Sequence, residues 1–179
     1  MRLYAADPIA WSSIRADYEF AGMHRVIVVG VDGSAGGYAA VAEAAELAKR
    51  FSADLIALSV EEGLPKVPTL MDEVDEFKRK KDKYFAEVAI EAKRIAGEHG
   101  AKLWHEIRIG DAALQIVRFI DDVDADLVVL GYKGHSRLAL VIGTTAQKVN
   151  AQSRASVLIV KPTKASEAIW GGIFRIQDP

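Results

Sequence analysis

Five short runs of hydrophobic residues punctuate the chain and predict β-strands. Four of them are rich in Val, Ile and Leu and do not alternate with polar residues, which is typical of strands buried on both faces of a parallel sheet. These four runs are Val26–Val31, Leu55–Val60, Leu127–Leu130 and Val157–Val160. The fifth, Leu103–Ile109, alternates apolar and polar positions, so we expect one wetter face and a place at the edge of the sheet.

Helical periodicity fills the intervals between these runs. The predicted helices are Ala35–Phe51, Met71–His99, Asp111–Ile120 and Thr144–Gln152. Because strand and helix alternate four times before a final strand, the chain should form right-handed crossovers. The predicted fold class is therefore α/β, with a single open parallel sheet of five strands and helices on both faces.

The composition is that of an ordinary globular protein. The 179 residues favour one domain, half of them are hydrophobic, and 23 Lys and Arg against 25 Asp and Glu leave a formal charge of −2. This balance lacks the basic footprint of a nucleic-acid binder. No apolar run approaches the roughly 18 residues that span a bilayer, so we expect no membrane partner. The absence of cysteine excludes disulfides and thiolate chemistry and is compatible with a cytoplasmic location.

Both ends of the sequence lie outside the alternating unit. We expect an N-terminal extension over residues 1–23, the folded unit over residues 24–162 and a C-terminal tail over residues 163–179. The tail is too apolar for a free end, so we expect it to dock on something.

Candidate ligand chemistry gathers where the predicted strands end. Glycine-rich turns follow the first strand, at Val31–Ser34, and the fourth, at Gly131–Gly134, and a helix opens at Gly143–Thr145. Ligands of open α/β sheets bind outside the carboxyl ends of the strands, where the strand order reverses. Glycines let a ligand approach the backbone, and a helix N-terminus offers N–H groups to phosphate. Asp32 can accept hydrogen bonds from a ribose or a base, although the same glycines also suit plain turns.

Other familiar signatures are missing or incomplete. The chain has no Walker motif, no G-x-G-x-x-G after the first strand and no G-x-S-x-G. Asp122–Asp126 resembles the start of a calcium loop, but Leu127 stands where that loop needs glycine, so we interpret the segment as a helix-to-strand connection. The four histidines have no metal-ligand spacing, and we expect neither a metal site nor catalytic residues. His105 is expected in the edge strand.

The segment Arg25–Ser34, RVIVVGVDGS, together with the residues from Gly131 onward, resembles the universal stress protein family. The likeness covers about residues 24–162. It implies an adenine nucleotide alpha hydrolase-like, Rossmann-like fold with strand order 3-2-1-4-5, which agrees with Leu103–Ile109 at an edge. The order reverses between the first and fourth strands, where the two glycine-rich turns lie.

The resemblance extends to the ATP-binding members, which carry G-x2-G-x9-G-[ST] after the fourth strand. Gly131 and Gly134 match its beginning, and Gly143 and Thr144 its end, although the spacer here has eight residues instead of nine. The resemblance implies that Asp32 and Val60 contact ribose or adenine and that the glycines and Thr144 contact ribose and phosphates. Ile109 and Gly110 would close the adenine pocket. The expected nucleotide-binding residues are Val31, Asp32, Val60, Gly131, Gly134, Gly143, Thr144 and Thr145.

The implied function is a stress-response module that binds ATP or AMP, with or without Mg²⁺, with little or no catalysis. Family members usually pair as homodimers, and Val157–Val160 would otherwise be an exposed apolar edge. The tail could cover that edge instead. The alternatives are a slow ATPase or phosphotransfer protein that uses Asp32 and a nucleotide-free dimerisation module. On this interpretation, Gly131→Val or Gly143→Val should abolish nucleotide binding and leave the fold intact.

Overall fold

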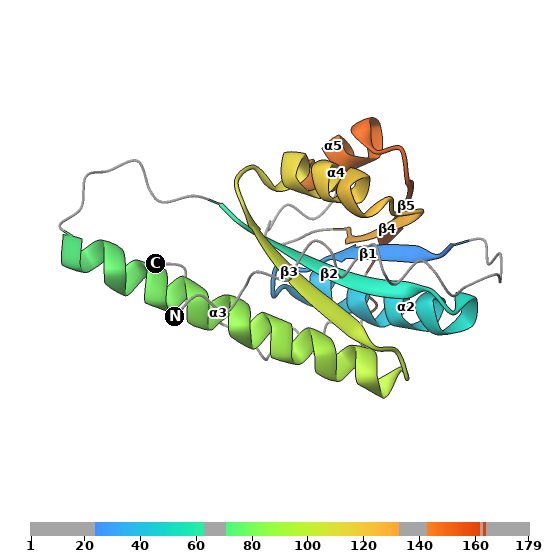
Figure 1. The fold of residues 1–179 in the computed structure, drawn as a ribbon, viewed down its shortest axis with the longest axis horizontal. Helices are drawn as coiled ribbons and strands as arrows, with labels where there is room; N and C mark the ends of the chain where they lie inside the picture. Colours follow the sequence, from blue (N-terminus) through green and yellow to red (C-terminus); the bar gives the residue numbers. More distant parts are fainter. Residues whose placement is uncertain (1–23, 63–70, 133–142, 162, 164–179) are drawn as a thin grey trace.

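The computed structural model describes residues 24–62, 71–132, 143–161 and 163, and they form a three-layer α/β sandwich (Figure 1). The strands are β1 (Val26–Gly30), β2 (Asp54–Glu61), β3 (Leu103–Ile109), β4 (Leu127–Gly131) and β5 (Ser156–Val160). The helices are α2 (Ala35–Phe51), α3 (Met71–Glu98), α4 (Ala112–Val123) and α5 (Thr144–Gln152). Each strand and helix expected from the sequence is therefore present, with ends that differ by a few residues.

All neighbouring strands are parallel, and their order is β3-β2-β1-β4-β5. This confirms the expected topology and puts the reversal of strand order between β1 and β4. Helices α2 and α3 cover one face of the sheet and α4 and α5 the other (Figure 1). The carboxyl ends of β1 and β4 consequently lie side by side at one edge of the sandwich.

The core is built from alternate residues of the central strands. Ile27 and Val29 pack toward α2 and α3, whereas Val28 packs toward α4 and α5, and all three are fully buried. Because both faces of the central strands are covered, their sequences are continuously apolar. The two central strands therefore give a rigid base to the turns that follow them.

The edge strand β3 differs from its expected pattern. Leu103 is buried, but the remaining residues are only half-buried or exposed, and Ile109 is 67% exposed. Burial therefore does not alternate along β3 as one wetter face would require, whereas the expected position at the edge of the sheet is confirmed. An edge strand has a neighbour on one side only, so the residues at its carboxyl end lose the cover that the central strands have.

The helix α4 is displaced from its expected bounds for a local reason. Asp111 precedes the helix as its N-cap and accepts a hydrogen bond from the Leu114 amide at 2.9 Å. The helix ends where Asp124 adopts a left-handed conformation at φ 51°. Asp126 then accepts hydrogen bonds from the backbone N–H groups of Arg25 and Val26. The aspartate-rich segment is therefore the helix-to-strand connection expected from its sequence.

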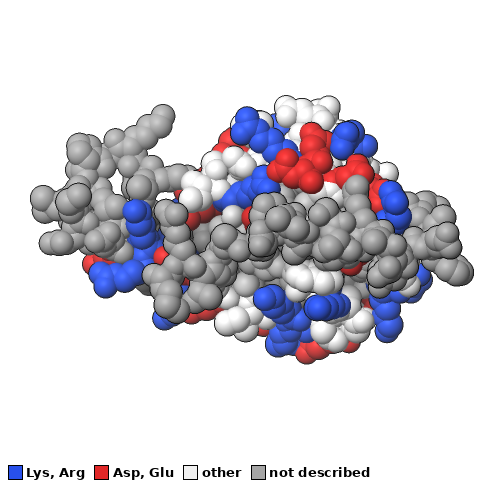
Figure 2. Space-filling view, viewed as in Figure 1, with Lys and Arg blue, Asp and Glu red and all other residues white. Residues whose placement is uncertain are grey.

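Basic and acidic side chains are intermixed on the face of the molecule drawn in Figure 2. Several form ion pairs, among them Arg154 with Asp121 and Arg108 with Asp122, each at 2.7 Å. Within the described ranges, no helix has both the length and the apolar character needed to cross a membrane.

Candidate functional site

The turn after β1 fixes the carboxylate of Asp32. Its Oδ1 accepts hydrogen bonds from the Ser34 amide at 3.0 Å and from the Ser34 hydroxyl at 2.5 Å. The same Ser34 oxygen accepts a hydrogen bond from the Gly37 amide at 3.0 Å and so caps α2. A serine at this position satisfies one of the N–H groups that every helix leaves unpaired at its start. The carboxylate is thereby coupled to the N-terminus of α2.

The end of β4 meets the same helix N-terminus. A Cβ added to Gly131 would lie 2.7 Å from the backbone carbon and oxygen of Gly36, and one added to Gly37 would lie 2.7 Å from Asp32 Oδ1. The structure thus brings Gly131 and Asp32 together against the first turn of α2. It also gives Gly131 a packing reason to be glycine, which argues against the expectation that Gly131→Val leaves the fold intact.

The base of the loop between β4 and α5 is closed by a backbone hydrogen bond. The Gly143 amide donates to the Tyr132 carbonyl at 2.9 Å, and the Tyr132 amide donates to the Val160 carbonyl at 2.7 Å. Helix α5 then begins at Thr144, with Gly143 as its N-cap and no side-chain cap hydrogen bond. Thr144 is exposed and Thr145 half-buried. The first turn of α5 therefore starts beside the end of β4 with N–H groups that a side-chain cap does not occupy.

The two remaining strand ends complete this edge of the sheet. The Val31 amide donates to the Leu58 carbonyl at 3.0 Å, which places Val60 beside the turn at the carboxyl end of β2. Val60 is half-buried and packs against the core on the side of α4 and α5. The Gly110 amide donates to the Glu61 carbonyl, so the end of β3 joins the same edge.

Three comparisons with known proteins assign the family. A model of the universal stress protein family matches residues 23–161. The chain belongs to the universal stress protein family. A universal stress protein of Methanocaldococcus jannaschii is 31% identical over 144 residues, which cover 79% of this chain and 85% of that protein.

Solved universal stress proteins share the fold. The protein from Lactobacillus plantarum has a TM-score of 0.69 and 25% identity, covering 76% of this chain and 97% of its own. A universal stress protein in complex with cAMP has a TM-score of 0.62 and 26% identity, covering 79% of this chain and 99% of its own. Adenine nucleotides also occupy two less similar proteins of the same fold, with dAMP in one from Archaeoglobus fulgidus at 22% identity and AMP in one from Arabidopsis thaliana at 14%.

Most of the residues expected to bind nucleotide lie at one edge of this universal stress protein fold. The residues that the structure places there are Val31, Asp32, Val60, Gly131, Gly143, Thr144 and Thr145. Gly134, together with Lys133 and His135, lies outside the described residues. Contact of any of these residues with a nucleotide remains a prediction. The described residues include no group of three or more His, Asp or Glu side chains that could hold a metal ion.

Three further polar side chains support the turn after β1, and the sequence analysis missed them as site residues. The Ser59 hydroxyl donates to the Val31 carbonyl at 2.9 Å and lies 2.9 Å from His105 Nε2. The Tyr84 hydroxyl donates to the Asp32 carbonyl at 2.5 Å. A serine in the otherwise apolar run Leu55–Val60 was the one available signal, because a buried hydroxyl needs a hydrogen-bond partner.

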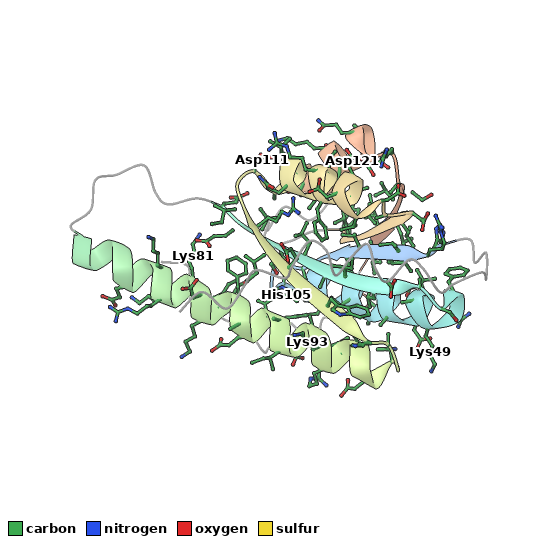
Figure 3. The ribbon with its side chains drawn as sticks, in the orientation of Figure 1. Lys49, Lys81, Lys93, His105, Asp111 and Asp121 are labelled. Carbon is green, nitrogen blue, oxygen red and sulfur yellow. The ribbon has the colours of Figure 1, made fainter. Side chains whose placement is uncertain are left out.

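His105 is held in its neutral form. Burial, with a smaller contribution from the positive charge of Lys93, lowers its pKa to about 4. Since the Ser59 proton goes to a carbonyl, which can only accept, His105 Nε2 must carry the hydrogen that it shares with Ser59. Figure 3 shows His105 and Lys93 in the region where β3 and α3 face each other.

Proposed function

We propose that this universal stress protein binds an adenine nucleotide at the carboxyl ends of β1 and β4 and acts as a stress-response binding module with little or no catalysis. One observation carries the proposal. The carboxylate of Asp32, held by Ser34, lies against the same helix N-terminus as Gly131, at the point where the strand order reverses. This is the position at which open α/β sheets bind ligands.

The proposed contacts divide between the base and sugar on one side and the phosphates on the other. Asp32 would accept hydrogen bonds from the ribose hydroxyls, and Val31 and Val60 would lie against the adenine. The N-terminus of α5, with Thr144 and Thr145, suits a phosphate group because helix N-termini bear N–H donors and partial positive charge. Gly131, Gly134 and Gly143 would let the phosphates approach the backbone. The complex of a related universal stress protein with cAMP supports an adenine nucleotide as the ligand.

ATP and AMP are both candidates, and the short spacer bears on the choice. The segment between Gly134 and Gly143 is one residue shorter than in the ATP-binding members, which affects phosphates more than adenosine. Asp32 and Lys133 supply only two charged groups, whereas phosphoryl transfer depends on several positioned charges. Binding without turnover is therefore preferred to a slow ATPase.

Homodimerisation through β5 is part of the proposal. Within the described ranges β5 pairs with β4 on one side only, and its residues Val157–Val160 are half-buried. Native sheets avoid exposed apolar edges, and a second copy would cover this one. Sedimentation of the full chain tests it, and a monomer at micromolar concentration would count against it. We also propose a cytoplasmic location, with neither a nucleic acid nor a membrane as partner.

The binding test combines three measurements on purified protein. Mass spectrometry of ligand released on denaturation identifies any nucleotide carried through purification. Added AMP or ATP, with and without Mg²⁺, at about 100 times its Kd should stabilise the fold by about 2.7 kcal/mol. Calorimetry should show weaker nucleotide binding to Asp32→Asn than to wild type. The matched control, Asp82→Asn at an exposed position, should bind nucleotide as wild type does. Absence of both released ligand and stabilisation would refute the proposal in favour of a nucleotide-free dimerisation module.

A further inference from the structure

Two consecutive carbonyls of the turn after β1 accept hydrogen bonds from side chains of two other elements, and a third element contacts one of those side chains. The Val31 carbonyl accepts from Ser59 of β2, whose oxygen also contacts His105 of β3. The next carbonyl, that of Asp32, accepts from Tyr84 of α3. These partners lie 28 to 52 residues away along the chain. The peptide groups on both sides of the Asp32 α-carbon are therefore hydrogen-bonded to side chains that lie outside the turn.

The ring of Tyr84 also determines the shape of the turn. Gly33 has a φ of 77°, and a Cβ on it would lie 2.3 Å from the Tyr84 hydroxyl oxygen and 3.1 Å from a methyl carbon of Val88. The turn can therefore approach α3 this closely only because residue 33 lacks a side chain. The peptide after Asp32 is thus held by Tyr84, while its carboxylate is held by Ser34.

The fully buried Ser59 and the half-buried His105 form a hydrogen-bonded polar pair. Ser59 is fully buried, and its two hydrogen bonds offset the cost of burying a hydroxyl. Loss of both bonds would leave the buried Ser59 hydroxyl without a partner among the groups that hold it here. The pair fixes the Val31 carbonyl and the direction in which the chain enters the turn.

These contacts act on the site through the backbone. Ser59 and His105 lie on the side of the sheet that α2 and α3 cover, whereas Val60 faces α4 and α5. The hydroxyl of Tyr84 is bonded to the main chain of Asp32, while the Asp32 carboxylate is bonded to Ser34. The effect of Tyr84 on a ligand should therefore appear in the group that Asp32 contacts.

We propose that Tyr84 and the Ser59–His105 pair are positioning residues that aim the Asp32 carboxylate at the ribose hydroxyls and so set the preference for a ribonucleotide. This assignment rests on the proposed nucleotide-binding function. The assignment goes beyond that function because it names the residues outside the turn that determine discrimination at the sugar.

The test compares two nucleotides that differ only at the sugar. Calorimetry gives the affinities of AMP and of 2′,3′-dideoxyadenosine monophosphate for wild type, Tyr84→Phe and Ser59→Ala. Tyr84→Phe removes one hydrogen bond and should weaken AMP binding by about 3- to 10-fold, and Ser59→Ala, which removes two, should weaken it at least as much. The affinity for the dideoxy nucleotide should change by less than about 2-fold, because that nucleotide makes no bond through its sugar hydroxyls.

A matched control separates positioning from loss of stability. Ser153→Ala removes a hydroxyl that also donates to a backbone carbonyl, that of Ala155, at the opposite end of the sheet. This variant should leave both affinities unchanged. Tyr84→Phe combined with Asp32→Asn should bind AMP no more weakly than Asp32→Asn alone, since Tyr84 acts through Asp32.

The outcomes distinguish failure of the proposed nucleotide-binding function from failure of the positioning role. A wild type that binds neither nucleotide refutes the proposed function and this assignment with it. A wild type that binds both equally, or a Tyr84→Phe and a Ser59→Ala that each weaken both nucleotides by the same factor, refutes positioning at the sugar while the binding function stands. Should Tyr84→Phe fail to fold, the ratio measured for Ser59→Ala decides alone.

Discussion

Replacing Gly131 by alanine tests whether packing or ligand approach requires a glycine at the end of β4. The added Cβ would lie 2.7 Å from the carbon and oxygen of Gly36 and 3.1 Å from the Gly37 amide nitrogen. Real Cβ atoms essentially never come this close to a heavy atom, and here the neighbours are backbone. The backbone of α2 or the end of β4 must therefore move.

The expected cost follows from the size of that movement. Inserting one carbon into a tightly packed interior costs about 1–3 kcal/mol. For a domain of this size each kcal/mol lowers Tm by about 2–4 °C, so Gly131→Ala should melt about 2–12 °C below wild type. Nucleotide binding should weaken as well, because the displaced backbone includes the Gly37 amide, which donates to the Ser34 hydroxyl that holds Asp32.

The assay is unfolding by urea and by heat, followed by circular dichroism on nucleotide-free protein. Gly97→Ala is the matched control, since a Cβ there meets nothing within 4 Å and lies inside α3. Alanine is the better helix former, so this variant should be unchanged or more stable by up to about 1 kcal/mol. If Gly131→Ala has the same Tm and the same free energy of unfolding as wild type and loses only nucleotide binding, the packing argument is wrong and the glycine serves the ligand.

Three further predictions concern stability. Since burial and Lys93 hold the pKa of His105 at about 4, against about 6.5 when unfolded, stability should fall as pH drops from 7 to 5, by about 2 kcal/mol from this group. In His105→Gln, urea titrations at pH 7 and pH 5 should show a loss of unfolding free energy that is smaller by this amount. A pH dependence of the unfolding free energy equal to that of wild type would contradict the assignment. Asp126→Ala should cost about 1–3 kcal/mol in chemical unfolding because two backbone N–H groups at the start of β1 lose their acceptor; a change under about 0.5 kcal/mol would mean that water replaces the carboxylate. Ser34→Ala should lose about 1 kcal/mol through the missing cap on Gly37, and a thermal melt equal to wild type would show that the cap contributes nothing.

The pattern of residues along the chain was enough to predict the elements of the fold. Helix α2 begins and ends at the residues expected from its periodicity, and the four continuous apolar runs are strands within a residue or two. Such patterns are reliable because the periods of helix and strand arise from local backbone geometry and burial. The strand order came from the resemblance to a family and from the alternation in Leu103–Ile109, which fits an edge.

The candidate site was also predicted in part from the sequence. Asp32, Gly131 and Gly143 were expected because each follows a strand or precedes a helix, which the sequence displays directly. Gly131 was assigned either to the ligand or to a plain turn, whereas the structure shows its packing against the backbone of Gly36. Which backbone lies opposite a glycine depends on how a strand and a helix dock, and no short stretch of sequence contains both partners.

The sequence by itself determined the elements, their alternation and the glycine-rich turns at the strand ends, because each depends on residues that are near one another along the chain. Only the tertiary structure revealed that Ser59, His105 and Tyr84 support the turn that holds Asp32. Ser59 and His105 are 46 residues apart, and Tyr84 is 52 residues from Asp32. These groups meet because two crossovers bring β2, β3 and α3 beside the end of β1. Hydrogen bonds between them therefore exist only once the sheet and its covering helix have formed.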